Sequence, residues 1–227
     1  MSRIRAVLFD LDGTLIDTAA DLLGTLDDVR AELGLPPCAA ALPPAVAARG
    51  GRGILALGFP ADPQAVERLL PRYLELYARR LARLSRPYAG IESMLDALAA
   101  RGVLLAIVTN KPQALAAALL EQIGWSVRFP VLVGGDTLAV RKPAPEPVWH
   151  ACAALGIAPA QAAMVGDDER DIQAGRAAGC GATLAAAYGY LEPGASAGDW
   201  AADAVVATPE ELLPALLTHI TGAPVPC

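Results

Sequence analysis

Two aspartates with one residue between them directly follow the first apolar segment of the chain. That segment, residues 4–9 (IRAVLF), is typical of a short strand buried on both faces, and Asp10 and Asp12 come next. Gly13 after them lets the backbone approach a ligand closely. Two carboxylates placed in this way can hold a divalent cation while one oxygen faces a substrate. The pattern therefore indicates an acidic chemical site at the end of a strand.

Three further polar clusters follow later in the chain. Residues 109–112 (TNKP) end the apolar run 103–108, and residues 141–143 (RKP) precede a helical pattern. The third cluster, 167–171 (DDERD), follows the apolar run 162–165 and holds four acids in five positions. Helix N-termini favour acids, which explains some of them but not so dense a group. These clusters are therefore candidate binding and catalytic segments.

The elements that carry these clusters alternate between strands and helices. Apolar runs typical of buried strands stand at residues 4–9, 103–108, 131–134, 162–165 and 182–187. Between them, helically spaced apolar residues end at the glycines 102, 124, 156 and 179. This alternation predicts an α/β fold with a parallel sheet covered by helices on both sides. Thr208 and Glu211 form a capping-box pair, which predicts one more helix.

The clusters are expected to meet at one edge of the sheet, because ligands of open parallel sheets bind at the carboxyl ends of the strands. If the strands concerned are neighbours, Asp10, Asp12 and Asp167 converge there with Thr109 and Lys142. Three carboxylates about 4–6 Å apart repel one another by several kcal/mol, so the cluster needs a cation. Mg²⁺ is the natural ion, because it prefers oxygen ligands and bridges to phosphates. We therefore expect Asp10, Asp12 and Asp167 to hold Mg²⁺.

These residue types favour phosphoryl transfer as the reaction. Asp10 is expected to be the nucleophile that takes the phosphoryl group from a substrate oxygen. Asp12 is expected to act as general acid toward the leaving alcohol and then as general base toward the water that hydrolyses the aspartyl phosphate. The expected substrate is a small-molecule phosphate ester.

The remaining candidates serve the phosphoryl group or the metal. Thr109 is expected to hydrogen-bond a phosphoryl oxygen, with Asn110 beside it in the substrate site. Lys142 is expected to offset negative charge there and to steady Asp10. Asp167 is expected to hold Mg²⁺ while Asp171 orders the waters of the ion.

Residues 17–86 break the alternation and predict a helical insert. They hold no convincing strand, and apolar residues recur at helical spacing in residues 22–33 and 66–84. The chain is thus predicted to consist of a sheet domain, residues 1–16 and 87–227, and an inserted helical domain, residues 17–86.

Two features of this insert carry expectations of their own. Pro71 is expected to kink or break a helix. Residues 50–53 (GGRG) indicate either a turn between helices or a loop that contacts the substrate through Arg52.

Composition excludes several classes of protein. The 227 residues carry a net charge of −6, which argues against general binding to nucleic acid or anionic membranes. No apolar run approaches the roughly 18–20 residues that cross a bilayer, so we expect a cytoplasmic protein. The four cysteines form no CxxC pair, and His150 and His219 have no second imidazole at ligand spacing. A zinc site, a redox dithiol and a Ser-His-Asp triad are therefore disfavoured.

The four clusters, in this order, resemble the motifs of the haloacid dehalogenase superfamily, and the likeness extends over about residues 4–213. The resemblance implies a Rossmann-like core, a mobile helical cap and an aspartate-nucleophile mechanism with roles on the residues Asp10, Asp12, Thr109, Lys142 and Asp167. Residues 109–112, 142–147 and 188–190 are similar to the phosphoglycolate phosphatase branch. Residues 200–203 are similar to bacterial N-acetylmuramic acid 6-phosphate phosphatases, whereas residues 36–60 depart most from the pattern.

Other activities remain open at this point. A sugar phosphomutase would use the same residues but return the phosphoryl group to the sugar. A haloacid dehalogenase would need neither Mg²⁺ nor a second carboxylate, so Asp12 argues against it. A receiver-like signalling module would accept phosphate on an aspartate, but it would not carry an insert of this length. The sequence leaves the choice between phosphoglycolate and a sugar phosphate open, as well as that between monomer and homodimer.

Overall fold

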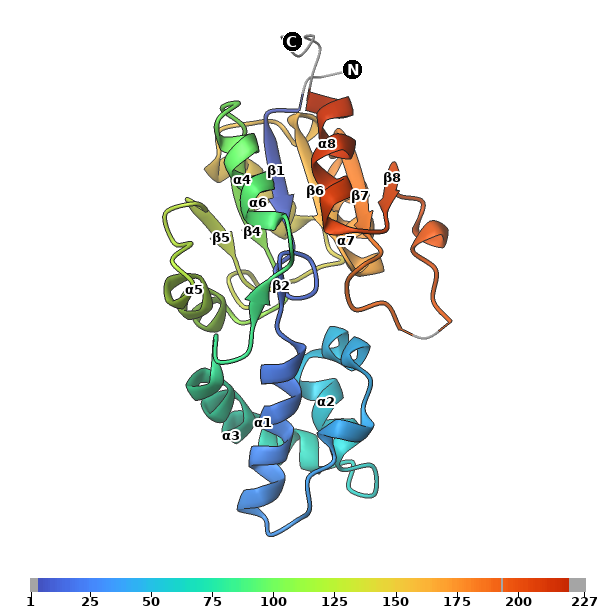
Figure 1. Ribbon diagram of the computed structural model, residues 1–227. Helices are drawn as coiled ribbons and strands as arrows, with labels where there is room; N and C mark the ends of the chain where they lie inside the picture. The colour runs from blue at the N-terminus through green and yellow to red at the C-terminus, as the bar shows by residue number, and fades with distance from the viewer. Residues whose placement is uncertain (1–3, 193, 221–227) are drawn as a thin grey trace.

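The computed structural model describes residues 4–192 and 194–220, in which six strands form one parallel sheet (Figure 1). The strands are β1 (Ala6–Phe9), β4 (Leu104–Val108), β5 (Val131–Val133), β6 (Ala162–Gly166), β7 (Ala182–Ala186) and β8 (Ala204–Val206). Their order across the sheet is β5-β4-β1-β6-β7-β8, so the strand order reverses at β1. The predicted α/β fold with a parallel sheet is confirmed. The short edge strand β8 was not predicted.

Helices cover both faces of this sheet. They are α4 (Ile91–Ala99), α5 (Gln113–Gln122), α6 (Glu146–Ala154), α7 (Glu169–Ala178) and α8 (Leu212–Ile220). Val7 and Phe9 belong to the apolar cluster that contains residues of α4, α5 and α8. Ala6 and Leu8 belong to a second cluster with residues of α6 and α7. Because alternate side chains of β1 enter two separate cores, the strand sequence is apolar at every position.

The start of the last helix differs from the predicted capping box. In the described chain the Thr208 side chain makes no capping hydrogen bond. Residues Pro209–Glu211 instead form a single 3₁₀ turn before α8. Glu211 reaches back to accept a hydrogen bond of 2.7 Å from the backbone N–H of Ala207. The helix therefore lies where the sequence predicted it. Its start is stabilised by Glu211, the residue before its first α-helical residue, and not by a Thr208 cap.

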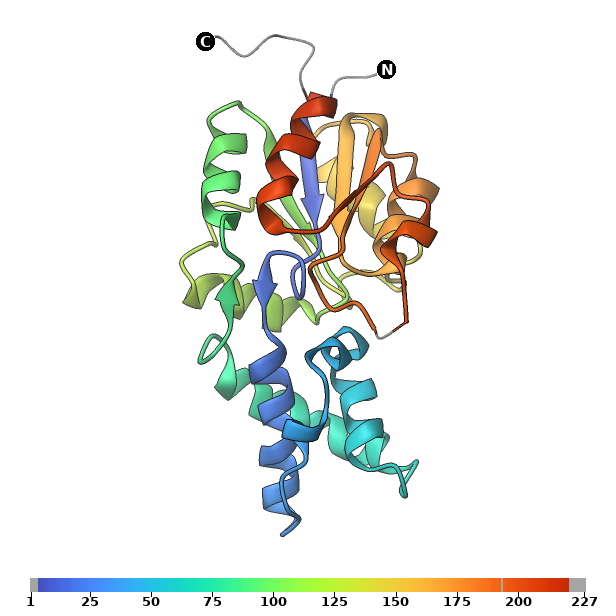
Figure 2. The ribbon, with the colours of Figure 1, turned by 45° about the vertical axis from the view of Figure 1, so that its right-hand side comes forward.

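Three helices lie together beyond the carboxyl edge of the sheet, in both ribbon views (Figures 1 and 2). They are α1 (Ala19–Glu32), α2 (Gly50–Gly58) and α3 (Ala65–Arg80). A two-stranded antiparallel ladder of β2 (Ile16–Asp17) and β3 (Arg86–Pro87) joins the two chain segments that lead to and from these helices. The expectation that residues 17–86 hold no strand missed this ladder, because two residues per strand give no readable alternation.

Two local expectations for the helical segment concern proline and glycine. Helix α3 runs through Pro71 without a break, because its buried face, with Tyr73 and Tyr77, packs against the neighbouring helices. A kink at Pro71 stays a prediction. Residues 50–53 form the first turn of α2, and Gly50, with a φ of +60°, joins α2 to the 3₁₀ helix Pro44–Arg49 before it, so the expected turn between helices is reduced to this one residue. A Cβ at Gly51 would lie 2.8 Å from a ring carbon of Tyr73. At this position glycine therefore permits close packing of α2 on α3.

Two further sequence features can be placed. None of the helices in the described part of the chain is long and apolar enough to cross a membrane. Cys38, Cys152 and Cys180 are free thiols, and Cys227 lies outside the described residues.

Candidate active site

The chemical clusters meet where the sequence predicted, at the carboxyl ends of three adjacent strands. Asp10 follows β1, Thr109 follows β4 and Asp167 follows β6. The backbone N–H of Asp10 donates to Val165 O at 2.9 Å, so the ladder of the sheet continues through this residue. Asp10, Asp12, Thr109, Asp167 and Lys142 all line one cavity between the sheet edge and helices α1–α3. The arrangement places them at the point where ligands bind in open α/β sheets.

Three carboxylates and one lysine form the centre of this cavity. Oxygens of Asp10, Asp167 and Asp171 all lie within 4.8 Å of one another. The Lys142 ammonium is buried, 2.9 Å from Asp10 Oδ1 and 2.6 Å from Asp171 Oδ1. It also donates a hydrogen bond of 2.6 Å to Val108 O. Lys142 is therefore held by the sheet and by two of the acids.

The negative charge of these three carboxylates is not fully compensated by Lys142. Burial raises the pKa of Asp167 well above its usual range, and the neighbouring Asp10 and Asp171 add to that shift. Burial likewise raises the pKa of Asp171 to about 7, although Lys142 opposes the shift. The buried Asp10 Oδ1, although in ion contact with Lys142, has no aligned hydrogen bond among the described residues. Crowded oxygen ligands that one lysine does not neutralise fit a divalent cation.

The raised pKa of Asp171 predicts how the stability of the metal-free protein depends on pH. Its ordinary value is 3.8, so between about pH 4 and pH 7 the unfolded chain ionises Asp171 more readily than the folded protein does. The free energy of unfolding in EDTA should therefore fall by a few kcal/mol across this window. Chemical denaturation at pH 5 and pH 8 measures the change. A metal-free protein that is more stable at pH 8 than at pH 5 would contradict it.

Asp167 is fixed by the motif that follows Asp10. Its carboxylate accepts hydrogen bonds from Thr14 Oγ1 at 2.6 Å and from the backbone N–H of Tyr190 at 2.8 Å. Gly13 has a φ of +84°, and a Cβ there would lie 2.1 Å from Asp167 Oδ2. Only glycine suits this position, because any side chain would collide with the acid and strain the backbone.

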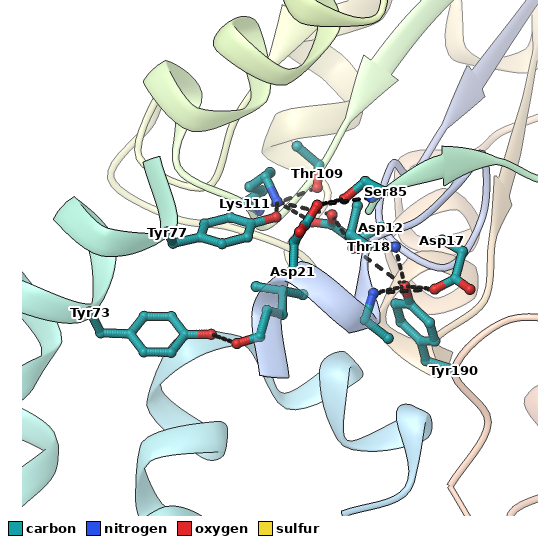
Figure 3. A network of polar contacts seen from close by, with 12 residues as sticks. Asp12, Asp17, Thr18, Asp21, Tyr73, Tyr77, Ser85, Thr109, Lys111 and Tyr190 are labelled. Atoms are coloured by element: carbon teal, nitrogen blue, oxygen red, sulfur yellow. Dashed lines mark hydrogen bonds and ion pairs between the residues drawn. The ribbon is translucent and has the colours of Figure 1, made fainter. Parts of the chain in front are cut away.

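Asp12 is not among the three clustered acids, and its carboxylate is bound by Thr18 and Lys111 instead (Figure 3). Its Oδ1 accepts from Thr18 Oγ1 at 2.7 Å, and Lys111 Nζ lies 2.9 and 3.1 Å from its two oxygens. The sequence predicted that Asp12 would lie in one cluster with Asp10 and Asp167, but in the structure Asp171 occupies that position in the cluster. The assignment of Asp12 as a metal ligand and of Asp171 as an organiser of waters stays a prediction. In the sequence, Lys111 was noted only as part of the cluster of residues 109–112. No sequence pattern indicated that it would pair with Asp12.

Tyr190 links the sheet to the first helix of the insert and was also missed (Figure 3). Its hydroxyl oxygen accepts hydrogen bonds from the backbone N–H groups of Thr18 at 2.5 Å and Ala19 at 2.8 Å. The same hydroxyl donates to Asp17 Oδ1 at 2.9 Å. The hydroxyl oxygen thus accepts from N–H groups at the start of α1 that have no partner within the helix.

Tyr190→Phe is expected to lower the free energy of unfolding by about 1–3 kcal/mol, because the Thr18 N–H loses its acceptor and the Ala19 N–H keeps only the longer hydrogen bond of 3.2 Å to Asp17 Oδ1. Urea denaturation measures the loss. Tyr188→Phe is the matched control, since the Tyr188 hydroxyl makes a single hydrogen bond, 2.7 Å to Thr14 O, among the described residues. A Tyr190→Phe variant as stable as the wild type would show that the start of α1 does not depend on this hydroxyl.

The two other predicted substrate contacts have structural partners. Asn110 lines the cavity and donates a hydrogen bond of 3.0 Å to Lys142 O, which ties two of the clusters together. Arg52 lines the cavity from α2, but its guanidinium is paired with Glu67 of α3 and is more than half exposed.

Two polar contacts join the segment before α2 to the sheet side of the cavity. Arg49 pairs with Glu192 at 2.6 Å, and Arg170 donates a hydrogen bond of 3.0 Å to Ala48 O. Both arginines line the cavity. Because the Arg49 pair is largely exposed, it adds little to stability.

Comparison with known proteins agrees with this geometry. The family model described as haloacid dehalogenase-like hydrolase matches residues 7–185. The chain is 45% identical over 209 residues to a phosphoglycolate phosphatase of Xanthomonas campestris pv. campestris, which covers 92% of this chain and 94% of that protein. It is 41% identical over 216 residues to an N-acetylmuramic acid 6-phosphate phosphatase of Pseudomonas aeruginosa, and this alignment covers 94% of this chain and 95% of that protein.

A solved structure shares the whole fold. The crystal structure of a predicted phosphoglycolate phosphatase from Haemophilus somnus 129PT matches with a TM-score of 0.83 at 26% identity, over 95% of this chain and 99% of that chain. The chain therefore belongs to the haloacid dehalogenase-like hydrolases, and its curated relatives place it among the phosphoric monoester hydrolases of that family.

Proposed function

We propose that this enzyme is a Mg²⁺-dependent phosphatase that hydrolyses a small phosphate monoester through an aspartyl phosphate on Asp10. The observation that carries the proposal is the position of the Asp10 carboxylate. It lies at the end of the central strand, 2.9 Å from the buried Lys142 ammonium and within 4.8 Å of Asp167 and Asp171. A carboxylate held beside a buried ammonium, in a cavity open to a ligand, is suited to accept a phosphoryl group.

In this proposal each side chain of the cavity has one task. Asp10 attacks phosphorus in line with the departing oxygen, while Lys142 and Thr109 stabilise charge on the phosphoryl oxygens. The Asn110 side chain supports Lys142 by donating a hydrogen bond to the backbone carbonyl of Lys142. Asp12 gives a proton to the leaving alcohol and later takes one from the attacking water.

The metal site is the second part of the proposal. Asp10 and Asp167 would hold Mg²⁺, with Asp171 beside them and Asp12 as the remaining predicted ligand. The crowded, undercompensated carboxylates support a hard divalent ion. When bound, Mg²⁺ would neutralise charge on the phosphoryl group.

The relatives suggest two substrates, phosphoglycolate and N-acetylmuramic acid 6-phosphate. We propose residues 17–86 as a cap domain over a core of residues 1–16 and 87–227, with the choice of substrate made by residues of both parts that line the cavity. The cytoplasm is the proposed location. Arg52 contacts the substrate only if it leaves Glu67.

A screen of phosphate monoesters with Mg²⁺, including both candidates, tests the activity. Release of inorganic phosphate and the free alcohol supports the phosphatase. Isomerised sugar phosphate without free phosphate would identify a phosphomutase, and dehalogenation of a 2-haloacid in EDTA would identify a dehalogenase. A phosphorylated Asp10 that lasts for minutes without phosphate release would favour a signalling module.

A further inference from the structure

Lys111 is a buried cation that faces the substrate cavity, and the tasks assigned above do not use it. Its side chain is only 4% exposed, yet it lines the cavity between the sheet and α3. The ammonium donates to Asp12 Oδ1 at 2.9 Å, to Asp12 Oδ2 at 3.1 Å and to Tyr77 Oη at 2.7 Å (Figure 3). These three hydrogen bonds use all of its N–H donors.

The other cations of the cavity are either committed or exposed. Lys142 is held by two acids and a carbonyl, and Arg170 is held by Asp168. Arg49 and Arg52 are roughly half exposed and paired with glutamates. Arg141 is exposed and has no carboxylate partner among the described residues. Among the described residues, Lys111 is thus a buried cation of the cavity that has no ion pair with the three clustered acids.

The ion pair between Lys111 and Asp12 is lost during the proposed reaction. As general acid, Asp12 must carry a proton on one of its oxygens, so its carboxyl group is then neutral and is no longer an anionic acceptor for Lys111 Nζ. A buried ammonium without an anionic acceptor is costly. Tyr77 offers a neutral hydroxyl, which does not replace a carboxylate. A second anionic group on the substrate would supply the missing acceptor.

We propose that Lys111 binds a carboxylate of the substrate and so selects phosphate monoesters that carry one. The inference rests on the proposed function and specifies its substrate class. The names of both kinds of relative, phosphoglycolate and N-acetylmuramic acid 6-phosphate phosphatases, denote substrates that are acids as well as phosphate esters. Because Lys111 touches Asp12, which serves the leaving oxygen, its subsite lies next to the ester linkage. A carboxylate close to that linkage, as in phosphoglycolate, suits the subsite best.

Two matched pairs of substrates test the proposal. 2-Phosphoglycolate is compared with ethyl phosphate, and N-acetylmuramic acid 6-phosphate with N-acetylglucosamine 6-phosphate, so that each pair differs in the carboxylate-bearing group. The wild-type enzyme should prefer the acid of at least one pair, as measured by kcat/KM. Lys111→Met should reduce that preference by roughly tenfold to a hundredfold, with the larger loss in the glycolate pair.

Two further variants separate recognition from folding and from overall charge. Tyr77→Phe keeps the ring and removes one partner of the ammonium, so it should lower the same preference by a few-fold. This variant decides the question if Lys111→Met does not fold. Arg141→Met removes one exposed positive charge from the same cavity and should change both members of a pair alike.

The outcomes distinguish the inference from the proposed function. A wild-type enzyme that hydrolyses these esters without preferring either acid overturns the inference and leaves the phosphatase intact. So does a preference that survives in Lys111→Met. A protein that releases phosphate from no monoester in the presence of Mg²⁺ overturns both.

Discussion

Asp10→Asn is expected to abolish phosphatase turnover, with kcat reduced at least about a thousandfold, because an amide oxygen is too weak a nucleophile to attack phosphorus. The change is isosteric, so the side chain still fits beside Lys142 and the end of β1. Phosphate release under saturating Mg²⁺ measures the effect. Turnover by the purified variant at the wild-type rate would refute Asp10 as the nucleophile.

The fold of this variant should survive, because the replaced group is one of three crowded acids. Removing a like charge relieves repulsion that raises the pKa of both Asp167 and Asp171. The metal-free variant should therefore melt no lower than the wild type. Asp168→Asn is the control for a mere change of charge near the site, since Asp168 is outside the group of three and bound to Arg170. Its kcat should stay within a few-fold of the wild type.

The sheet could be predicted because its central strands are buried on both faces. Residues 4–9 and 103–108 are nearly continuous apolar runs, and in the structure their alternate side chains enter two separate cores. The edge strand β8 and the β2–β3 ladder could not be predicted, because runs of two or three residues give no periodicity. The role of Gly51 could not be predicted for a different reason, since glycine there permits close packing against Tyr73 of a helix some twenty residues later.

The site could be predicted as far as the backbone determines it. Residues at the carboxyl ends of adjacent parallel strands must lie close together, so Asp10, Thr109 and Asp167 were expected to converge if their strands were neighbours, and β4, β1 and β6 are neighbours in the sheet. Side-chain direction is another matter. Asp12 turns toward Lys111, and Tyr190 reaches back to the start of α1, because of partners more than ninety residues away. Such contacts depend on tertiary packing that no local pattern encodes.

Asp167→Asn is expected to raise the Mg²⁺ concentration for half-maximal activity at least about tenfold, because it removes one of the carboxylates proposed to hold the ion. Titration of phosphatase activity with Mg²⁺ measures the shift, after EDTA has been shown to abolish wild-type activity. The amide also disturbs local hydrogen bonds. Asp167 accepts from both Thr14 and Tyr190, whereas the nitrogen of asparagine cannot accept.

Thr14→Val separates these two effects. It removes the hydrogen bond of 2.6 Å to Asp167 but leaves the carboxylate and its charge in place. If the carboxylate binds the ion, Thr14→Val should change the Mg²⁺ requirement much less than Asp167→Asn. If the two variants shift the requirement equally, the role of Asp167 is to order the loop after β1 rather than to hold the metal. If Asp167→Asn kept the wild-type Mg²⁺ requirement, Asp167 would not be a ligand of the ion. The ion would then need ligands other than the predicted set.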